Sequence, residues 1–129
     1  MLKQRRNVSQ RPPQHCALSL CVKYLSGVWT PNILWYLGAH ARRFTELKRD
    51  LPGVSAKVLT QRLKRLQADG LVLRMVVATS PPSVEYSLTE LGRTLRPALE
   101  SLVRVGEQIK LNQSAAILTP WTPLPTSPA

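Results

Sequence analysis

The most regular apolar pattern in the chain lies within residues 53–70. Leu59, Leu63 and Leu66 recur at the spacing that places apolar side chains on one face of an α-helix. Ser55 suits the N-cap, because its hydroxyl can accept a hydrogen bond from an otherwise unpaired N–H group of the first turn. The pattern therefore predicts a helix that begins after Ser55 and has one narrow apolar face.

Residues around this face support the same helix. Val54 precedes the cap at the spacing of a hydrophobic staple with Leu59. Gly70 can adopt the left-handed conformation that ends a helix in a Schellman motif. We expect Arg62 at the edge of the apolar face, with its stem across neighbouring apolar surface. The opposite face carries Lys57, Gln61, Lys64 and Ala68 and is flanked by Thr60 and Arg65, so its charged residues are all basic.

Shorter elements are predicted before this helix. A helix over residues 16–26 would carry Leu18, Val22 and Leu25 on one face, and we expect Cys21 to lie in the core. The aromatic side chains of the next segments are also expected in the core rather than around a ligand: Trp29, Trp35, Tyr36 and Phe44.

The segment that follows predicts helix, strand and helix. Thr30 caps a helix in which the next residue, a proline, suits the first position, and this helix stops near Gly38. Residues 43–44 form a brief strand. Thr45 caps a short helix that the Pro-Gly pair at residues 52–53 brings to an end. The helix that Thr45 caps and the helix that begins after Ser55 are therefore expected to be joined by a tight turn.

The apolar period changes to two beyond Gly70. Alternation over residues 71–77 and again over 84–88 predicts two strands, and the Pro- and Ser-rich residues 78–83 between them suit a loop. The sequence therefore predicts a β-hairpin with a wide tip.

Thr89 then caps a long apolar-faced helix to about Leu111, with a kink at Pro97. The order of elements predicts a mainly α fold with a small β-hairpin (α+β), a winged helix-turn-helix with dimerisation helices at both ends. We divide the chain into a flexible basic arm (1–14), this domain (15–111) and a disordered Pro-rich tail (112–129).

The charge is strongly positive. The chain has 18 Lys and Arg against 7 Asp and Glu, a formal net charge of +11 and a pI near 10.7. A pI above roughly 9 is typical of nucleic-acid binding. Within residues 42–74 three acidic residues face nine basic ones: Arg42, Arg43, Lys48, Arg49, Lys57, Arg62, Lys64, Arg65 and Arg74.

Other classes of protein find little support. The longest apolar stretches are far shorter than the ~20 residues of a membrane-spanning helix, and no signal peptide is convincing, so we expect a cytoplasmic protein without membrane contact. Two cysteines are too few for a disulfide framework. His15 and His40 are isolated and not at metal-ligand spacing, and His15 with Cys16 makes a poor nucleophile–base pair. We expect no enzyme, no metal and no cofactor.

The chain from residue 16 to about 107 resembles the HxlR-type winged-helix transcriptional regulators, a bacterial group related to the MarR regulators. The matching pieces occur in order with short spacers: Cys16, Gly27-Val-Trp29, Ile33-Leu-Trp35, Arg43-Phe-Thr-Glu-Leu47, Leu51-Pro-Gly-Val-Ser55, Lys57-Val-Leu-Thr-Gln-Arg-Leu63, Asp69-Gly-Leu71 and Pro81-Pro-Ser-Val-Glu-Tyr-Ser-Leu-Thr-Glu-Leu-Gly92. The chain departs from the family pattern at Val28, Ser83 and Val105, where the family often has Lys, a basic residue and Trp.

The resemblance implies a homodimer that binds operator DNA and controls nearby genes, and we expect a repressor. Two recognition helices of a dimer would lie about 34–36 Å apart, so the operator should be pseudo-palindromic. The predicted DNA-binding residues fall into two groups. Base edges and groove walls are expected to meet Ser55, Lys57, Thr60, Gln61, Lys64 and Arg65, whereas phosphates are expected to meet Arg42, Arg43, Lys48, Arg49 and Arg74. Ser83 leaves the wing tip without a cation.

Two questions stay open at the level of sequence. In some members of the resembled family a cysteine at the position of Cys16 senses oxidants or electrophiles, often through an intersubunit disulfide; alternatively, Cys16 is a small residue packed at a helix start. A small-molecule or oxidant effector is thus one option. The rival to DNA binding is a winged-helix protein–protein adaptor whose basic face binds an acidic partner.

Overall fold

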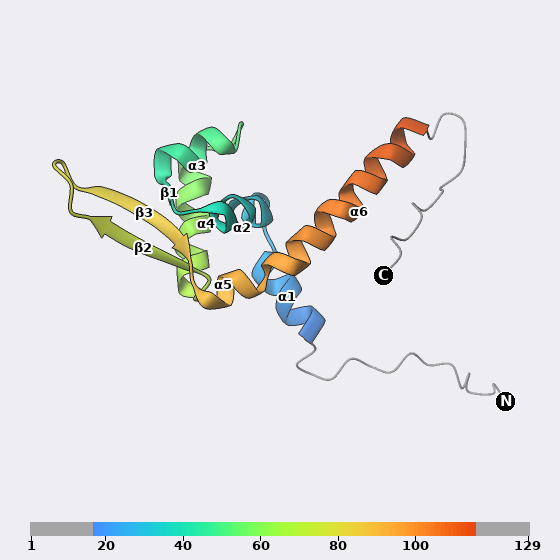
Figure 1. Cartoon of the computed structure of the whole chain (residues 1–129), viewed down its shortest axis with the longest axis horizontal. Coiled ribbons are helices and arrows are strands. Elements are labelled where there is room, and N and C mark those ends of the chain that lie inside the picture. Colours follow the sequence, from blue (N-terminus) through green and yellow to red (C-terminus); the bar gives the residue numbers. More distant parts are fainter. Residues whose placement is uncertain (1–16, 116–129) are drawn as a thin grey trace.

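The computed structural model describes residues 17–115, which form a helical body with a three-stranded sheet and one long helix that projects from it (Figure 1). The arm, His15, Cys16 and residues 116–129 of the tail lie outside the described residues. The elements follow the predicted order: α1 (Ala17–Leu25), α2 (Thr30–Ala39), β1 (Arg42–Arg43), α3 (Phe44–Asp50), α4 (Ala56–Ala68), β2 (Val72–Val77), β3 (Ser83–Leu88), α5 (Glu90–Thr94) and α6 (Arg96–Ala115).

The sheet is antiparallel in the order β1-β3-β2, with β2 and β3 as the predicted hairpin. Arg42 and Arg43 of β1 pair with Tyr86 and Glu85 of β3, which ties the segment before α3 to the hairpin. A helix-turn-helix followed by a hairpin is a winged helix, so the predicted fold class is confirmed.

The core gathers apolar side chains of α2, α3, α4 and the start of α6 around the base of the hairpin. The three leucines that predicted α4 are all buried, at 1% exposure or less. They pack with residues of α2, α3, the strands and the start of α6: Ile33, Leu34, Leu37, Leu47, Leu51, Val54, Leu71, Val72, Tyr86, Leu88, Leu95 and Leu99. The polar side of α4 is thereby turned to solvent.

The ends of α4 form as predicted. Ser55 Oγ accepts a hydrogen bond from the Val58 N–H at 3.1 Å. At the other end the Leu71 N–H donates to Leu66 O at 2.9 Å and the Gly70 N–H donates to Gln67 O at 3.0 Å. These are the two hydrogen bonds of a Schellman motif, and Gly70 has the left-handed φ of 75° that the motif requires.

Two predicted caps are wrong by one or two residues. Trp29, with a left-handed φ of 78°, occupies the N-cap of α2. Thr30 is already helical, and its Oγ1 is buried without a hydrogen-bond partner. Arg43 occupies the N-cap of α3 instead of Thr45, and its N–H donates to Glu46 Oε1 at 3.0 Å. Because Arg43 is paired in β1, that strand covers residues 42–43 rather than 43–44.

The predicted long helix is broken in two. Thr89 caps α5, its Oγ1 accepting from the Gly92 N–H at 3.0 Å, but the helix stops at Thr94 and α6 begins at Arg96. Pro97 has no N–H to continue α5, and in the first turn of a new helix none is needed. At its far end α6 passes the predicted Leu111 and reaches Ala115, since the intervening residues include neither Gly nor Pro.

Candidate nucleic-acid interface

The exposed face of α4 is the centre of the candidate site. Lys57, Gln61 and Lys64 lie opposite the buried leucines and are exposed. Among the described residues, no hydrogen bond or ion pair engages these three side chains. These long polar side chains are therefore free to contact a ligand outside the protein.

The start of α4 and its second turn are polar as well. Ser55 and Thr60 are both exposed, but their hydroxyls are used within the helix, because Thr60 Oγ1 donates to Ala56 O at 2.8 Å and Ser55 Oγ caps the first turn. Each keeps acceptor capacity for an outside donor, and the Thr60 methyl is available for apolar contact.

Helix α3 adds a second set of cations beside α4. Lys48 and Arg49 are exposed at its last turn. Leu51 and Val54, on either side of Pro52-Gly53, are buried, and the Val54 N–H donates to Leu51 O at 3.1 Å. The turn therefore fixes how α3 and α4 lie relative to each other.

The acidic residues of this region are used within the protein. Asp50 pairs with Arg42 Nη1 at 3.3 Å, Asp69 pairs with Arg65 Nε at 3.8 Å, and Glu46 accepts from the Arg43 N–H. Arg42 is correspondingly half-buried, so it braces β1 against the end of α3. The exposed surface of α3 and α4 consequently keeps its positive charge.

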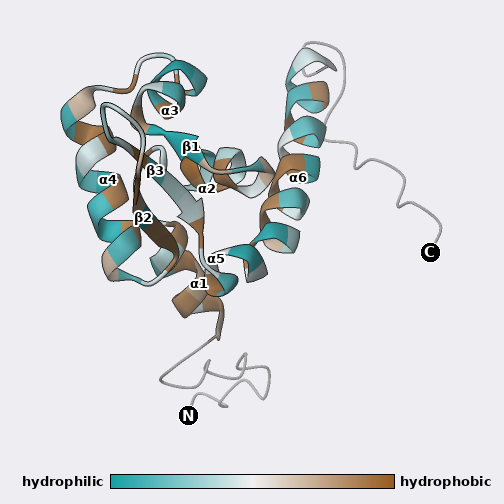
Figure 2. Cartoon of the chain, turned by 60° about the vertical axis from the view of Figure 1, so that its left-hand side comes forward, coloured by the Kyte–Doolittle hydropathy of each residue, from teal (hydrophilic) through white to brown (hydrophobic). Residues whose placement is uncertain are grey.

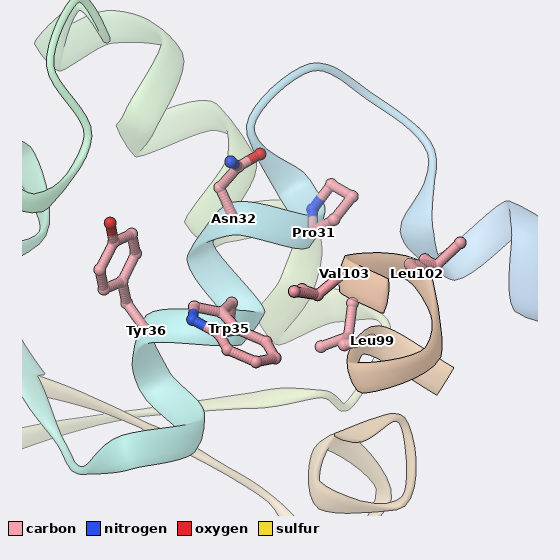
Figure 3. A pocket seen from close by; sticks show the side chains of 7 residues that line it. All are labelled: Pro31, Asn32, Trp35, Tyr36, Leu99, Leu102 and Val103. Atoms are coloured by element: carbon pink, nitrogen blue, oxygen red, sulfur yellow. The ribbon is translucent and has the colours of Figure 1, made fainter. Parts of the chain in front are cut away.

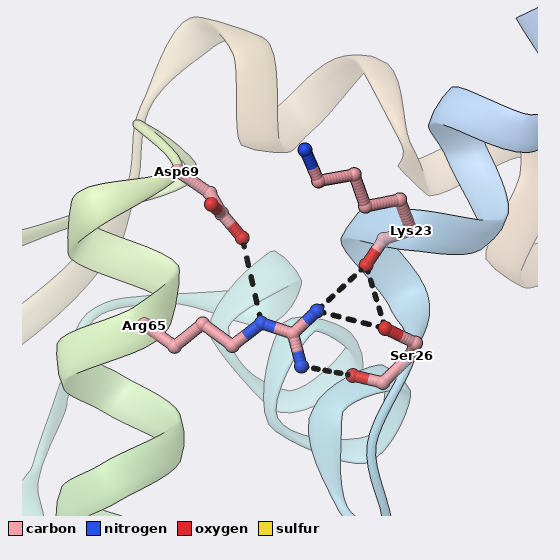
Figure 4. Close-up of polar contacts among 4 residues, drawn as sticks. All are labelled: Lys23, Ser26, Arg65 and Asp69. Carbon is pink, nitrogen blue, oxygen red and sulfur yellow. Dashed lines mark hydrogen bonds and ion pairs between the residues drawn. The ribbon is translucent and has the colours of Figure 1, made fainter.

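Arg65 does not face the same way as the rest of the predicted set. Its guanidinium points to the end of α1, where Nη2 donates to Lys23 O at 2.9 Å and to Ser26 Oγ at 2.8 Å, and Nη1 donates to Ser26 O at 3.1 Å (Figure 4). The expectation that Arg65 lines the groove-facing surface therefore fails. At about 100° per residue, Arg65 lies on the flank of α4 that also carries Arg62.

Sequence reasoning missed the partners of these arginines. Arg62 Nε donates to Val28 O at 2.9 Å, whereas only its apolar stem was expected to matter. The sequence did contain one indication of these contacts. Arg62 and Arg65 lie three residues apart on one flank of the helix, and two such cations indicate hydrogen-bond acceptors on a neighbouring element.

The wing carries little charge beyond its base. Arg74 is exposed on β2 opposite Tyr86, and no charged residue occurs between Arg74 and Glu85. Thr79 Oγ1 closes the tip by donating to Pro81 O at 2.8 Å. Arg74 is thus the one cation that β2 and β3 offer.

Apolar side chains are exposed on the terminal helices. No residue of α1 is buried, and Leu18 is 70% exposed. Cys21, expected in the core, is an exposed free thiol, because within residues 17–115 only the last turn of α1 packs against the core. On α6 the exposed set is Leu102, Val103, Val105, Ile109 and Leu111; brown segments recur along both helices in Figure 2.

A pocket of about 340 Å³ opens between α2 and α6 (Figure 3). Trp35, which was also expected in the core, lies in its wall and is 43% exposed. The other wall residues are Pro31, Asn32, Tyr36, Leu99, Leu102 and Val103. The remaining aromatic residues of the prediction, Trp29, Tyr36 and Phe44, do pack against the core.

Within residues 17–115, no three His, Cys, Asp or Glu side chains converge as a metal site. In the same part of the chain, no helix is both long and apolar enough to cross a membrane.

Comparison with known proteins decides the family. The model of the HxlR-like helix-turn-helix family matches residues 24–114. This chain belongs to the HxlR-like helix-turn-helix family. Relatives of this chain are named HTH-type transcriptional regulators, so the chain is a transcriptional regulator with a helix-turn-helix DNA-binding domain. The chain is 40% identical over 91 residues to the uncharacterized HTH-type transcriptional regulator YkvN of Bacillus subtilis. The matched region covers 70% of this chain and 77% of YkvN.

Solved structures of other regulators share the fold. The oxidized form of the redox regulator HypR superimposes with a TM-score of 0.68 at 37% identity, covering 71% of this chain and 95% of HypR. The reduced form of the regulator YodB of B. subtilis gives a TM-score of 0.64 at 30% identity, covering 70% of this chain and 89% of YodB.

Proposed function

We propose that this HxlR-like protein is a homodimeric repressor that binds double-stranded DNA at a specific pseudo-palindromic operator in the cytoplasm. The observation that carries the proposal is the exposed face of α4, where Lys57, Gln61 and Lys64 have no partner among the described residues. A helix of this kind fits the major groove of B-DNA.

The roles divide by chemistry. Gln61 can pair bidentately with adenine, and Lys57 and Lys64 can contact guanine, each good pair being worth roughly 1–3 kcal/mol of discrimination. Ser55 and Thr60 would contact the groove wall. Phosphate contacts, which give affinity without base preference, fall to the exposed cations of β1, α3 and β2: Arg43, Lys48, Arg49 and Arg74. Arg42, paired with Asp50, supports them.

A second copy of the chain would cover the apolar faces of α1 and α6. Exposed leucine, valine and isoleucine side chains on two helices at one end of the fold are typical of protein interfaces, and apolar area of this kind is stabilised by burial. The dimer brings two α4 helices to one side of the duplex, and repression follows when the bound dimer blocks a promoter.

The base-reading role is tested by one pair of variants. We expect Gln61→Ala to lower affinity for the operator while leaving binding to unrelated duplexes unchanged, because base contacts distinguish sequences. Arg49→Ala should weaken binding to both by a similar factor, because a phosphate contact carries no sequence information. Fluorescence anisotropy on the DNA upstream of the protein's own gene and on a scrambled duplex measures both.

Equal behaviour of the two variants would contradict the division of roles. Failure of the protein to bind any duplex, together with saturable binding to an acidic protein, would favour the adaptor function instead.

Cys16, which precedes α1 in the sequence, is proposed as an oxidant sensor. The support is that α1, which begins at the next residue, offers apolar surface for a dimer, together with the similarity to HypR, which is described as a redox regulator. Free N–H groups at a helix start favour the reactive thiolate. Oxidation would then alter the dimer and its affinity for DNA.

Treatment with diamide should change operator affinity in the parent protein and in Cys21→Ser, and should have no effect on Cys16→Ser. A response that survives in Cys16→Ser and disappears in Cys21→Ser would assign sensing to the exposed Cys21 instead.

A further inference from the structure

The strongest polar connection between α1 and the rest of the fold is made by the helix proposed to read DNA. Arg65 of α4 donates three hydrogen bonds to the end of α1 and to Ser26 (Figure 4). Arg62 donates one to Val28 O. We name these two arginines and their acceptors Lys23 O, Ser26 and Val28 O the clasp.

The clasp suits the chemistry of a helix end. The last carbonyl groups of α1 have no partner within the helix, and a cation there is favoured by the helix dipole. Arg65 supplies both the N–H donors and the charge, and its fork of fixed donors can hold several acceptors at once. Asp69, one turn further along α4, pairs with Arg65 Nε at 3.8 Å and orients the guanidinium.

The segment that the clasp holds has a demanding backbone. Gly27 has a φ of 104°, and a Cβ there would come within 3.1 Å of Arg62 Nε. Trp29 has a φ of 78°, a region that residues with a side chain seldom adopt. Conformations of this kind persist when surrounding contacts fix them. The clasp is therefore placed to determine how the connection from α1 to α2 is folded.

Packing alone holds α1 weakly. None of its residues is buried, and only Tyr24 and Leu25, in its last turn, pack against the core. We propose that Arg65 is a positioning residue: with Arg62 it couples α1 to α4, so that the position of α1 sets the orientation of the recognition helix. This inference rests on the proposed function, in which α1 belongs to the dimer interface.

The coupling explains why two arginines of a DNA-binding helix face inward. If α1 is fixed by a second copy of the chain, a rigid link to α4 fixes the relation between the two recognition helices. Their spacing selects the operator, whereas contact with unrelated DNA through phosphates does not depend on it.

The test compares two variants, Arg65→Met and Lys64→Met. Both remove one positive charge from neighbouring positions of α4, but Lys64 has no partner among the described residues, whereas Arg65 belongs to the clasp. Hydrogen exchange of the free protein is the first measurement. We expect the amides of residues 20–27 to exchange about tenfold faster in Arg65→Met, with the amides of α2 and α3 unchanged, and no effect of Lys64→Met. Unchanged exchange in Arg65→Met would overturn the clasp, whether or not the protein binds DNA.

Salt dependence of duplex binding is the second measurement. Each lost phosphate contact lowers the slope of log K against log salt by about 0.9. For Arg65→Met we expect affinity for the operator to fall about tenfold with an unchanged slope on unrelated DNA. A lower slope would make Arg65 a direct DNA contact and overturn the proposal.

Two further variants keep the test decisive if Arg65→Met does not fold. Arg65→Lys retains the charge but lacks the fork, so it should still accelerate exchange in α1. Ser26→Ala removes one acceptor and should accelerate exchange less than Arg65→Lys does. In the double variant Arg65→Lys, Ser26→Ala, the additional effect of Ser26→Ala should be smaller than in the parent protein, because coupled residues are not additive. Additive effects, or full rescue by lysine, would contradict a forked clasp.

Discussion

Gly92→Ala is expected to lower the free energy of unfolding by about 3 kcal/mol, near the upper end for overpacking of a core. Gly92 is buried in α5, and a Cβ there would collide with the backbone carbonyl oxygen of Leu71 and lie 3.1 Å from the Leu88 side chain. The backbone carbonyl has little freedom to move, because Leu71 O also accepts from the Thr89 N–H at 3.0 Å.

Gly38→Ala is the matched control. Gly38 also lies within a helix, but a Cβ there would meet nothing within 4 Å, so removing a flexible glycine should stabilise the fold by roughly 0.5–1 kcal/mol. Urea unfolding at one protein concentration measures both variants. Equal stability of Gly92→Ala and the parent protein would show that Gly92 of α5 does not lie against the backbone of Leu71 as described.

Removing Lys57 and Lys64 together is expected to give the largest loss of DNA binding. In a dimer the double variant Lys57→Ala, Lys64→Ala takes four cations from the duplex surface, and we expect operator affinity to fall by at least about a hundredfold at moderate salt. The slope of log K against log salt should also decrease, by up to about 0.9 for each of these cations that neutralises a phosphate.

The control variant removes a positive charge far from α4 along the chain. Lys110 is exposed near the end of α6, so Lys110→Ala removes a cation without touching the candidate interface. Anisotropy titrations over a series of salt concentrations should show little change for this variant. If Lys110→Ala and the α4 variant weakened binding equally per charge, binding would depend on overall charge and not on the face of α4.

Local signals in the sequence predicted the recognition helix well. The Ser55 cap, the leucine spacing and Gly70 each depend on residues within about one turn, and each is confirmed. The period-two pattern likewise placed the wing. Sequence reasoning failed at two caps. Thr30 and Thr45 are good caps in isolation, but Trp29, with its left-handed backbone, holds the N-cap of α2, and Arg43, paired in β1, holds the N-cap of α3.

Contacts between distant segments could not be predicted in the same way. Arg65 is separated from Ser26 by 39 residues, and its spacing from Arg62 indicates a shared flank of the helix without identifying the acceptors that lie there. The exposed Cys21 and Trp35 were assigned to the core because apolar spacing indicates burial without saying what covers the face. In α1 and beside α6, residues 17–115 leave the apolar face exposed.

The central claim, specific readout of DNA by α4, is tested most directly by selecting binding sites from a pool of random duplexes with the full-length protein at moderate salt. We predict enrichment of a pseudo-palindrome with half-sites one helical turn apart, about 10–10.5 base pairs between centres. In a parallel selection, Gln61→Ala should lose preference at symmetric positions of that motif, and Arg49→Ala should keep the motif. A pool that shows no enriched sequence, or the same motif with Gln61→Ala as with the parent, would contradict the claim.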